Sequence, residues 1–355
     1  MSADISIDDL HIHDPREARK SAVRVLKAGI VPFLQSSPGI GKSSIMRDIA
    51  KEFNLKVIDH RLSTSSPTDL SGLPWIVNGM AKFNPFEFFP IKGMDIPEGY
   101  DGWLLFLDEF NSAPKSVQAA AYQLVLDRQV GQHQLHSNVL IAAAGNLETD
   151  RAITNQLSTA MQSRVIHIRM ETNLKIWLED VGYKHNYDSR ITGYLNFQPS
   201  SLMDFQPNHS NPSFSCPRTW EFMQRLIASN NGVIEDSDVK LFAGTITPGV
   251  ATSFMNFVKV YSKMLTFRQI MHDPTGVDIP SDPATRWAVS SMLGERIATT
   301  DLTDEECLKV FKYVNRNPTE IRVMFFRSAL TRKPTLRRKP EVITAIAELS
   351  RYLQD

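Results

Sequence analysis

The chain carries a short glycine-rich segment whose residue types are suited to holding a triphosphate. It reads Ser36-Ser37-Pro38-Gly39-Ile40-Gly41-Lys42-Ser43 and lies between an apolar run and a run with helical spacing. Glycines let backbone N–H groups turn inward around phosphate oxygens, and a following helix adds the positive end of its dipole. Lys42 is a compact cation for the β- and γ-phosphates, and the Ser43 hydroxyl can ligate Mg²⁺. The predicted phosphate-binding residues are Ser37, Pro38, Gly39, Ile40, Gly41, Lys42, Ser43 and Ser44.

One position of this phosphate loop (residues 36–44) departs from the usual pattern. Ser36, five residues before Gly41, stands where the pattern has glycine. The glycines remain at Gly39 and Gly41, where the loop is tightest. The departure leaves open a second, non-enzymatic hypothesis, in which the chain is a nucleotide-binding scaffold with weak turnover.

A pair of acidic residues complements the phosphate loop. Apolar residues lead to Asp108 and Glu109 at the predicted carboxyl end of a strand, which is the edge where open α/β sheets bind ligands. Asp108 is predicted to hold Mg²⁺, and Glu109 to orient or deprotonate an attacking water. The alternative is a pair of capping acids before a helix that begins near Pro114, but that alternative leaves the spacing to the phosphate loop unexplained.

The elements that must position these residues alternate along the chain. Apolar runs of strand length occur at residues 30–35, 55–60, 103–107, 139–144 and 165–168. Helical spacing occurs at residues 15–29, 44–53 and 114–128. The run 103–107 is apolar without alternation, as expected for a strand covered on both faces. The order predicts an α/β fold of the P-loop nucleoside-triphosphatase class, with a parallel sheet and helices on both faces.

After about residue 171 the pattern becomes helical. Helices are predicted at residues 219–229, 237–242, 253–265, 284–297, 304–314, 318–330 and 340–353, with a linker at 273–283. We therefore expect a nucleotide-binding core over residues 1–170, an all-α lid over 171–265 and an extra helical segment over 266–355. The core contains an insert, residues 63–97, that is rich in proline and aromatic residues and reads as a hairpin or loop.

Composition excludes several classes of protein. Lys plus Arg and Asp plus Glu both number 39, so bulk charge does not favour coating of nucleic acid or of an anionic membrane. Cys216 and Cys307 are too few for a disulfide framework or a four-cysteine zinc site. No apolar run is long enough to span a bilayer, and the first residues lack the apolar core of a signal peptide. We expect a cytoplasmic protein with no membrane partner.

A longer run of residues resembles a known family. The residues Asp108-Glu109-Phe110-Asn111-Ser112-Ala113-Pro114, the pair Val117-Gln118 and the later Arg128-Gln129-Val130 are similar to the MoxR group of AAA+ ATPases, whose members have an Arg-Gln-Val helix end. The resemblance covers roughly residues 31–228. It implies hydrolysis of ATP with Mg²⁺ and a self-assembled ring, most often a hexamer. It also implies remodelling of a client protein, in some members with a partner that bears a von Willebrand factor A domain.

The resemblance implies roles for three further residues. Asn146, which ends a strand beside the acidic pair, is similar to the sensor 1 residue that reads the γ-phosphate, although Leu147 stands where the family usually has proline. Arg164 in Ser163-Arg164-Val165 is the implied arginine finger for a neighbouring subunit, with Arg151 as the alternative. Arg218 resembles the sensor 2 arginine of the lid. The alternative for both Arg164 and Arg218 is an ordinary surface arginine.

Several features remain open. Trp75 and the aromatic residues of 83–89 either line a pore and grip a client or pack against one another. The basic residues of segment 327–339 leave a nucleic-acid-stimulated motor as an alternative function, although a solvated surface is the usual outcome. The histidines at positions 11, 13, 133 and 136 lack cysteine or acidic partners at ligand spacing, so we do not expect a metal there.

Overall fold

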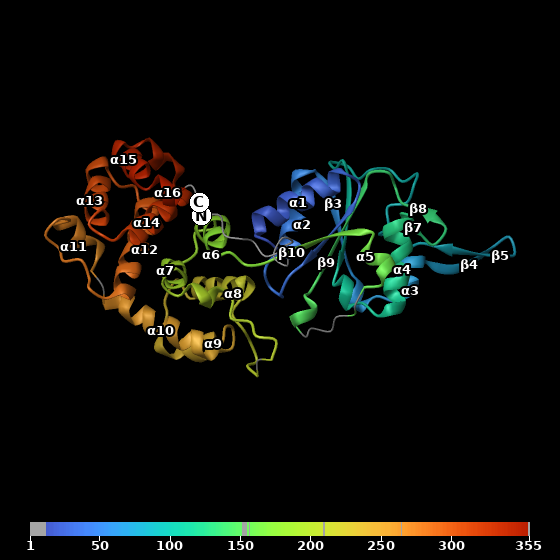
Figure 1. Ribbon diagram of the computed structural model, residues 1–355, viewed down its shortest axis with the longest axis horizontal. Helices are drawn as coiled ribbons and strands as arrows, with labels where there is room; N and C mark the ends of the chain where they lie inside the picture. The colour runs from blue at the N-terminus through green and yellow to red at the C-terminus, as the bar shows by residue number, and fades with distance from the viewer. Residues whose placement is uncertain (1–11, 151–154, 156, 209, 264, 354–355) are drawn as a thin grey trace. The chain divides into compact units, whose positions relative to one another are not determined.

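The chain is described by a computed structural model that covers residues 12–150, 155, 157–208, 210–263 and 265–353. It divides into two compact units (Figure 1). The α/β unit comprises Met1–Thr172 with Gln206–His209, and the helical unit comprises Asn173–Phe205 with Ser210–Asp355. The predicted three-part division, with bounds at residues 170 and 265, stays a prediction.

The α/β unit is built on a six-stranded sheet with the order β1-β10-β2-β9-β6-β3. The strands are β1 (Ile12–His13), β2 (Val31–Gln35), β3 (Leu55–Arg61), β6 (Gly102–Asp108), β9 (Val139–Gly145) and β10 (Val165–Met170). All neighbouring strands are parallel. Because β9 lies between β2 and β6, the carboxyl ends of these three strands adjoin at one edge of the sheet, where parallel sheets bind ligands.

Helices cover both faces of this sheet. On one face α1 (Pro15–Lys27) and α2 (Lys42–Glu52) share an apolar cluster with Leu104 and Phe106 of β6. On the other face α4 (Lys115–Leu126) packs with the alternate residues Leu105 and Leu107. The side chains of a strand point alternately to opposite faces, so the apolar residues of β6 pack against the helices on both faces of the sheet. The predicted fold class, a parallel α/β sheet between helices followed by a helical region, is confirmed.

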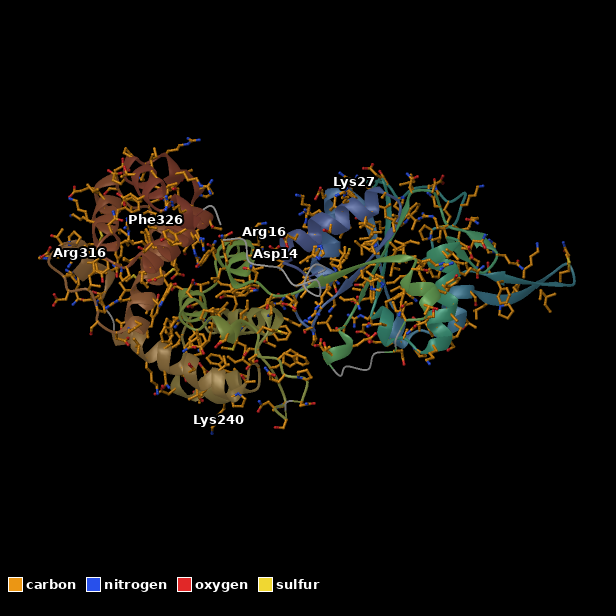
Figure 2. The ribbon with its side chains drawn as sticks, in the orientation of Figure 1. Asp14, Arg16, Lys27, Lys240, Arg316 and Phe326 are labelled. Carbon is orange, nitrogen blue, oxygen red and sulfur yellow. The ribbon has the colours of Figure 1, made fainter. Side chains whose placement is uncertain are left out.

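Local capping fixes the first helix of this layer. The Asp14 carboxylate accepts a hydrogen bond from the Glu17 N–H at 2.9 Å, and the Glu17 side chain accepts in return from the Asp14 N–H. Asp14 and Lys27 are labelled at the two ends of this helix in Figure 2. This reciprocal arrangement satisfies two amides that a helix start leaves without partners. At the other end of α1, the Lys27 ammonium lies 5.6 Å from the centre of the Phe53 ring.

The insert contains the predicted hairpin. It consists of α3 (Pro67–Ser71), β4 (Leu73–Val77) and β5 (Met80–Asn84), and the hairpin projects from the α/β unit (Figure 1). The short strands β7 (Gln129–Val130) and β8 (His133–Gln134) form a second two-stranded sheet. The helix predicted over residues 114–128 ends at Leu126, because Arg128 has a left-handed φ of 53° and Gln129 already belongs to β7. The implied Arg-Gln-Val helix end is therefore wrong.

The remaining short elements of the α/β unit border the sheet. They are η2 (Leu62–Thr64), η3 (Phe110–Ser112), η4 (Glu148–Asp150) and α5 (Thr159–Gln162). The first three follow strands β3, β6 and β9 directly or within a few residues. They therefore lie at the same edge of the sheet as the phosphate loop.

The helical unit contains elements that the sequence pattern did not predict. Among them are α6 (Leu174–Trp177), the π-helix η5 (Leu178–Tyr183) and α7 (Ser189–Phe197). In α7 the residues from Ile191 to Leu195 are all buried, so no polar stripe marks the helix in the sequence. Gly193 of α7 meets α12 closely, because a Cβ there would lie 3.0 Å from the Ser291 Cβ.

The other helices of this unit form two connected apolar clusters. They are η6 (Pro199–Leu202), α8 (Pro217–Ser229), η7 (Asp236–Asp238), α9 (Val239–Ala243), α10 (Pro248–Lys263), α11 (Phe267–His272), α12 (Pro283–Thr299), α13 (Asp304–Val314), α14 (Thr319–Arg332), η8 (Pro334–Arg338), α15 (Pro340–Glu348) and α16 (Ser350–Leu353). Trp220 is fully buried in one cluster, and Phe326 stacks on Phe311 in the other (Figure 2). Helix α12 contributes Ala288 to the first cluster and Val289 to the second. Within the described ranges, no helix has the length and apolar character that crossing a membrane requires.

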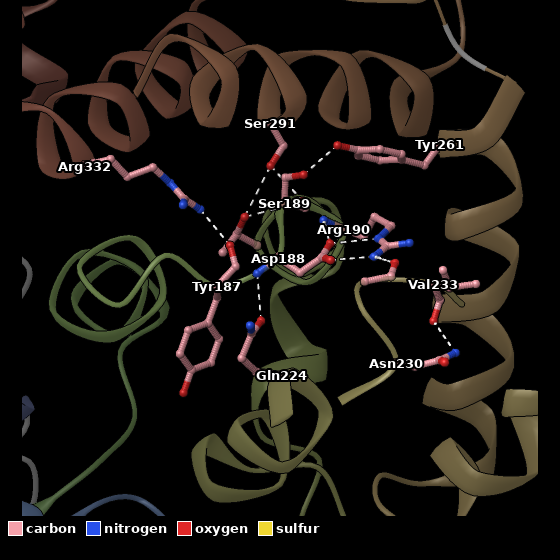
Figure 3. Close-up of polar contacts among 12 residues, drawn as sticks. Tyr187, Asp188, Ser189, Arg190, Gln224, Asn230, Val233, Tyr261, Ser291 and Arg332 are labelled. Atoms are coloured by element: carbon pink, nitrogen blue, oxygen red, sulfur yellow. Dashed lines mark hydrogen bonds and ion pairs between the residues drawn. The ribbon is translucent and has the colours of Figure 1, made fainter. Parts of the chain in front are cut away.

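A buried polar network ties α7 to its neighbours (Figure 3). The Arg190 Nε donates to Asp188 Oδ1 at 2.8 Å, and the Asp188 N–H donates to the Gln224 side chain at 2.7 Å. The Ser291 hydroxyl donates to the Ser189 carbonyl at 2.8 Å, and Arg332 donates to the Tyr187 carbonyl at 2.9 Å. Asp188 and Arg190 thus offset each other's charge inside the unit, whereas the Nε of Arg332 has no hydrogen-bond partner among the described residues.

Candidate nucleotide-binding site

The phosphate loop joins β2 to α2. Gly39 and Gly41 adopt φ values of 80° and 112°, a region that favours glycine. Gly41 is the residue before α2, which begins at Lys42, two residues earlier than predicted. The amides of its first turn have no partners within the helix, so they are available to an anion bound in the loop.

Lys42 connects the phosphate loop to the end of β9. Its Nζ donates to the Ser36 carbonyl at 2.8 Å, to the Ser36 hydroxyl at 3.1 Å and to the Asn146 Oδ1 at 3.2 Å. The structure therefore brings together the predicted phosphate cation and the predicted sensor residue. These oxygens and the Ser37 carbonyl, at 3.4 Å, are neutral acceptors, which form weaker bonds to an ammonium than a phosphate oxygen does.

Ser36, the departure from the glycine pattern, is fully buried beneath Lys42. Its backbone is not among the left-handed positions of the chain, so a side chain is tolerated there. The hydroxyl supplies one of the acceptors for Lys42. The departure therefore has a local structural explanation, and the scaffold with weak turnover stays an untested alternative.

Two oxygen donors form the predicted magnesium position. The Ser43 Oγ, in the first turn of α2, donates to Asp108 Oδ2, at the end of β6, at 3.0 Å. Mg²⁺ prefers oxygen ligands and is usually held by one or two protein groups together with substrate phosphates, so this pair fits the ion. Among the described residues, no group of three or more His, Cys, Asp or Glu could hold a metal by itself. His13, His133 and His136 belong to no such group, and His11 lies outside the described residues.

Glu109 stands at the turn after β6. Its φ of 55° is left-handed, and it precedes η3 instead of capping α4, whose N-cap is Pro114. The acid pair is therefore not the cap of that helix. The Glu109 carboxylate accepts a hydrogen bond from the Ser63 hydroxyl, and its N–H donates to Asp108 Oδ1 at 2.8 Å. Ser63 is not among the predicted site residues. The sequence marks it only as a polar residue just after β3.

Asn146 lies at the end of β9 and is held by a second asparagine. The Nδ2 of Asn111 donates to the Asn146 carbonyl at 2.8 Å, and the Oδ1 of Asn111 accepts from the Asn146 N–H at 3.2 Å. Asn111 is buried in η3, just beyond the acidic pair. In the sequence, Asn111 is noted only as part of the family resemblance, and its bonds to the backbone of Asn146 were not predicted.

Asp150 is a further acid near the phosphate loop that no motif indicated. It is 8% exposed, and its Oδ1 accepts a hydrogen bond from the Ser37 hydroxyl at 3.1 Å. Its Oδ2 has no hydrogen-bond partner among the residues that the structure describes. Burial raises the pKa of this carboxyl, although the bond from Ser37 and the charge of Lys42 act in the opposite direction.

Of the three predicted arginines, the structure describes Arg164 in the α/β unit and Arg218 in the helical unit. Arg164 lies over the Tyr122 ring at 5.2 Å and donates to the Ala160 carbonyl at 2.8 Å. Arg151 lies outside the described residues. Arg218 is exposed in the first turn of α8, in the helical unit. The roles of all three stay predictions.

The aromatic insert separates into two parts. On the hairpin, Trp75, Ile76 and Met80 are 68%, 75% and 63% exposed. Behind it, Phe88 stacks on His60 with ring centres 5.2 Å apart, and Phe89 is buried. The aromatic residues after 84 therefore pack on one another, although Phe88 remains 39% exposed, while the hairpin presents apolar side chains to solvent.

Most of the basic segment 327–339 makes contacts within the helical unit. Arg327 lies 3.8 Å from Glu179, Lys333 lies 3.9 Å from Asp301, and Lys339 pairs with Asp304. Arg332 lies over the Tyr183 ring and bonds to the Tyr187 carbonyl. Arg337 and Arg338 are exposed. The nucleic-acid alternative therefore depends mainly on Arg337 and Arg338, and it stays a prediction.

A phosphate loop between β2 and α2, on a parallel sheet with helices on both faces, defines the P-loop class of nucleoside-triphosphatase folds. Comparison with protein-family models gives no match, and comparison with curated proteins gives none either. Among solved structures, the chain is similar to the RuvB Holliday junction branch migration motor of Thermotoga maritima, with 16% identity, a TM-score of 0.37, and coverage of 86% of this chain and 90% of that chain.

The chain is also similar to a Cytophaga hutchinsonii protein described as a candidate ATPase. That likeness has 13% identity and a TM-score of 0.36, and it covers 96% of this chain and 90% of that chain. Likenesses this distant carry no weight for the activity. The functional proposal therefore depends on the residues of the site.

Proposed function

We propose that the chain is a Mg²⁺-dependent ATPase similar to the MoxR group of the AAA+ superfamily, which works as a ring and remodels a client protein. One observation carries the hydrolytic part. Lys42 lies 3.2 Å from Asn146, and Ser43 lies 3.0 Å from Asp108, so cation, amide and metal ligands converge at one edge of the sheet. The choice of adenine, the ring and the client come from the family resemblance.

The residues divide the work of hydrolysis. Lys42 exchanges its neutral acceptors for phosphate oxygens and offsets the charge that develops on the terminal phosphate. Glu109 orients the attacking water and takes up its proton, while Asn146 holds the water or reads the γ-phosphate. Ser43 and Asp108 would hold Mg²⁺, which when bound neutralises charge on the β- and γ-phosphates.

A lysine pair on one helix tests this assignment. Lys42→Ala is expected to lower ATP affinity and to lower the hydrolysis rate on the order of 10²-fold, because it removes the cation at the phosphates. The matched control is Lys51→Ala, which removes an exposed lysine from the last turn of the same helix. Phosphate release and binding of a fluorescent ATP analogue are the measurements. A parent chain that neither binds nor hydrolyses ATP in the presence of Mg²⁺ would overturn the proposal.

The ring requires a residue that completes the site from a neighbouring subunit. Arg164 is our candidate because the family resemblance implies this role. Its side chain contacts Tyr122, Ala160 and Ser163 of its own chain, which are far in the sequence from the phosphate loop. Mixing inactive Arg164→Ala with inactive Lys42→Ala is expected to restore part of the activity, since mixed interfaces regain one intact site. Native mass measurement with ATP and Mg²⁺ reports the assembly. Absence of rescue at every mixing ratio would count against Arg164.

The hairpin supports the client-binding part of the proposal. Its exposed Trp75 and Ile76 are apolar side chains held out from the α/β unit, a feature that marks contact surfaces in soluble proteins. A client, or a partner that bears a von Willebrand factor A domain, would contact this surface. The same side chains are dispensable for the core, which contains neither of them.

A further inference from the structure

The side chain of Asn111 forms hydrogen bonds to both backbone groups of one neighbour. Its amide nitrogen donates to the Asn146 carbonyl at 2.8 Å, and its amide oxygen accepts from the Asn146 N–H at 3.2 Å. Asn111 is only 2% exposed, so water does not compete for these bonds. A side-chain amide that satisfies both backbone groups of one residue fixes the position and the orientation of that residue.

We call this pair of hydrogen bonds the Asn111–Asn146 clasp. The residue before Asn146 is Gly145, and it leaves the space that the clasp needs. A Cβ on Gly145 would lie 2.1 Å from the Asn111 Oδ1 and 3.0 Å from the Phe33 ring. Gly145 has an ordinary φ, so glycine is needed here for space and not for backbone conformation. The close approach of Asn111 to the end of β9 therefore depends on the missing side chain.

The clasp connects the acidic turn to the sensor position. Asn111 follows Glu109 by two residues in η3, while the Asn146 side chain reaches Lys42 at 3.2 Å. The Asn111 carbonyl also accepts from the Asn155 N–H at 2.6 Å, which holds η3 from the other side. Displacement of η3 would therefore move the base and the amide together.

We infer that Asn111 is a positioning residue for hydrolysis, which fixes the backbone of Asn146 so that its side-chain amide faces Lys42 and the terminal phosphate. The inference rests on the proposed function and adds a residue that acts through another. Misplacement of a catalytic group by about 1 Å can cost on the order of 10²-fold in rate. Nucleotide affinity depends on the phosphate loop itself and is expected to change little.

The test compares four variants of the full chain: Asn111→Ala, Asn146→Ala, the double variant, and Gln118→Ala as the control. Gln118 is also a buried amide that donates to a backbone carbonyl, that of Ala113 at 3.1 Å, but it does not bond to Asn146. Asn111→Ala is expected to lower kcat about 10–100-fold while the Kd for ATP stays within about threefold. The double variant should be no slower than Asn146→Ala, because Asn111 acts through Asn146.

Two results would overturn the inference. One is an unchanged kcat in folded Asn111→Ala, and the other is a double variant whose loss equals the product of the two single losses. If Asn111→Ala fails to fold, Gly145→Ala opens the clasp from the opposite side and is expected to show the same loss of kcat. A folded Gly145→Ala with parental kcat would then overturn it.

A separate readout distinguishes failure of this inference from failure of the proposed function. A parent chain without ATPase activity contradicts the proposed function. The clasp is then judged by the side-chain amide resonance of Asn146 in chain labelled with ¹⁵N-asparagine. That resonance is expected to shift in Asn111→Ala and to stay in place in Gln118→Ala, and a resonance that does not move in Asn111→Ala would overturn the inference.

Discussion

Two polar networks lie in the two units, one around Lys42 and the other around Arg190. In the helical unit, Arg190 and Asp188 pair directly, and their remaining bonds go to a side-chain amide and to the Gly232 carbonyl. In the α/β unit, Lys42 donates to neutral oxygens, and Asp150 keeps a carboxylate oxygen without a hydrogen-bond partner. The residue types are similar, but the charge of Arg190 is offset by a directly bonded carboxylate, whereas the acceptors of Lys42 named above are neutral.

That difference separates a structural network from a binding site. Buried polar groups in a structural network are satisfied within the fold, because an unsatisfied group costs stability. At the phosphate loop, the glycine turn and Lys42 can bind an anion, and the oxygen pair of Ser43 and Asp108 can bind its metal ion. If the comparison is right, substitutions around Lys42 act on activity and those around Arg190 act on stability.

The largest effect is expected for Glu109→Gln. The amide keeps the size of the carboxylate but cannot accept a proton from water, so kcat should fall about 10²–10⁴-fold while ATP binding is retained. Phosphate release and equilibrium binding measure the two quantities. The matched control is Glu148→Gln, an exposed acid in η4 close to the same loop. A parent no faster than Glu109→Gln would favour the nucleotide-binding scaffold over the ATPase.

The next effect should appear in stability and not in hydrolysis. Asp188→Ala leaves Arg190, whose side chain is 17% exposed, without its carboxylate, and we expect a loss of about 2–3 kcal/mol in the free energy of unfolding. The control is Glu221→Ala, which breaks the Glu221–Arg225 pair on the surface of α8, where less than about 0.5 kcal/mol is expected. Urea denaturation measures both. Equal losses in the two variants would remove the distinction between the networks.

The parts of the site that lie within one local segment could be predicted from the sequence. The apolar strands, the glycine turn before α2 and the acids after β6 can each be recognised within about ten residues. The same local pattern indicated the parallel sheet and its helices. It overextended α4 by two residues, because the left-handed turn at Arg128 depends on the β7–β8 hairpin that follows.

The rest depended on contacts between distant residues. Ser63 lies 46 positions from Glu109, Asn111 lies 35 positions from Asn146, and Ser37 lies 113 positions from Asp150. Such pairs leave no periodic trace in the sequence, so only the fold reveals them. Helix α7 was missed for a related reason: it is buried on nearly every side, and its pattern reflects its neighbours instead of an amphipathic stripe.

The smallest effect is expected for Asp150→Asn, and its sign sharpens the comparison. Burial raises the pKa of Asp150 from its ordinary value of 3.8, so the folded chain holds this proton more tightly than the unfolded chain does. Ionisation of the Asp150 carboxyl therefore destabilises the folded chain. This loss of stability grows as pH rises from below the pKa of the unfolded chain to above the pKa of the folded chain. An asparagine at this position would avoid that loss while its amide oxygen still accepts from Ser37.

The free energy of unfolding of Asp150→Asn should thus exceed that of the parent by an amount that increases as pH rises. We expect this gain to be smaller than the loss in Asp188→Ala. Denaturation at one pH below both pKa values and one above them measures this trend. A difference that is flat with pH would mean that the Asp150 carboxyl has the same pKa in the folded and unfolded chains, which would contradict the raised pKa. A variant that gains stability at high pH but hydrolyses ATP more slowly would show that the α/β unit keeps a costly charge beside Ser37 and Lys42 because the phosphate loop uses it.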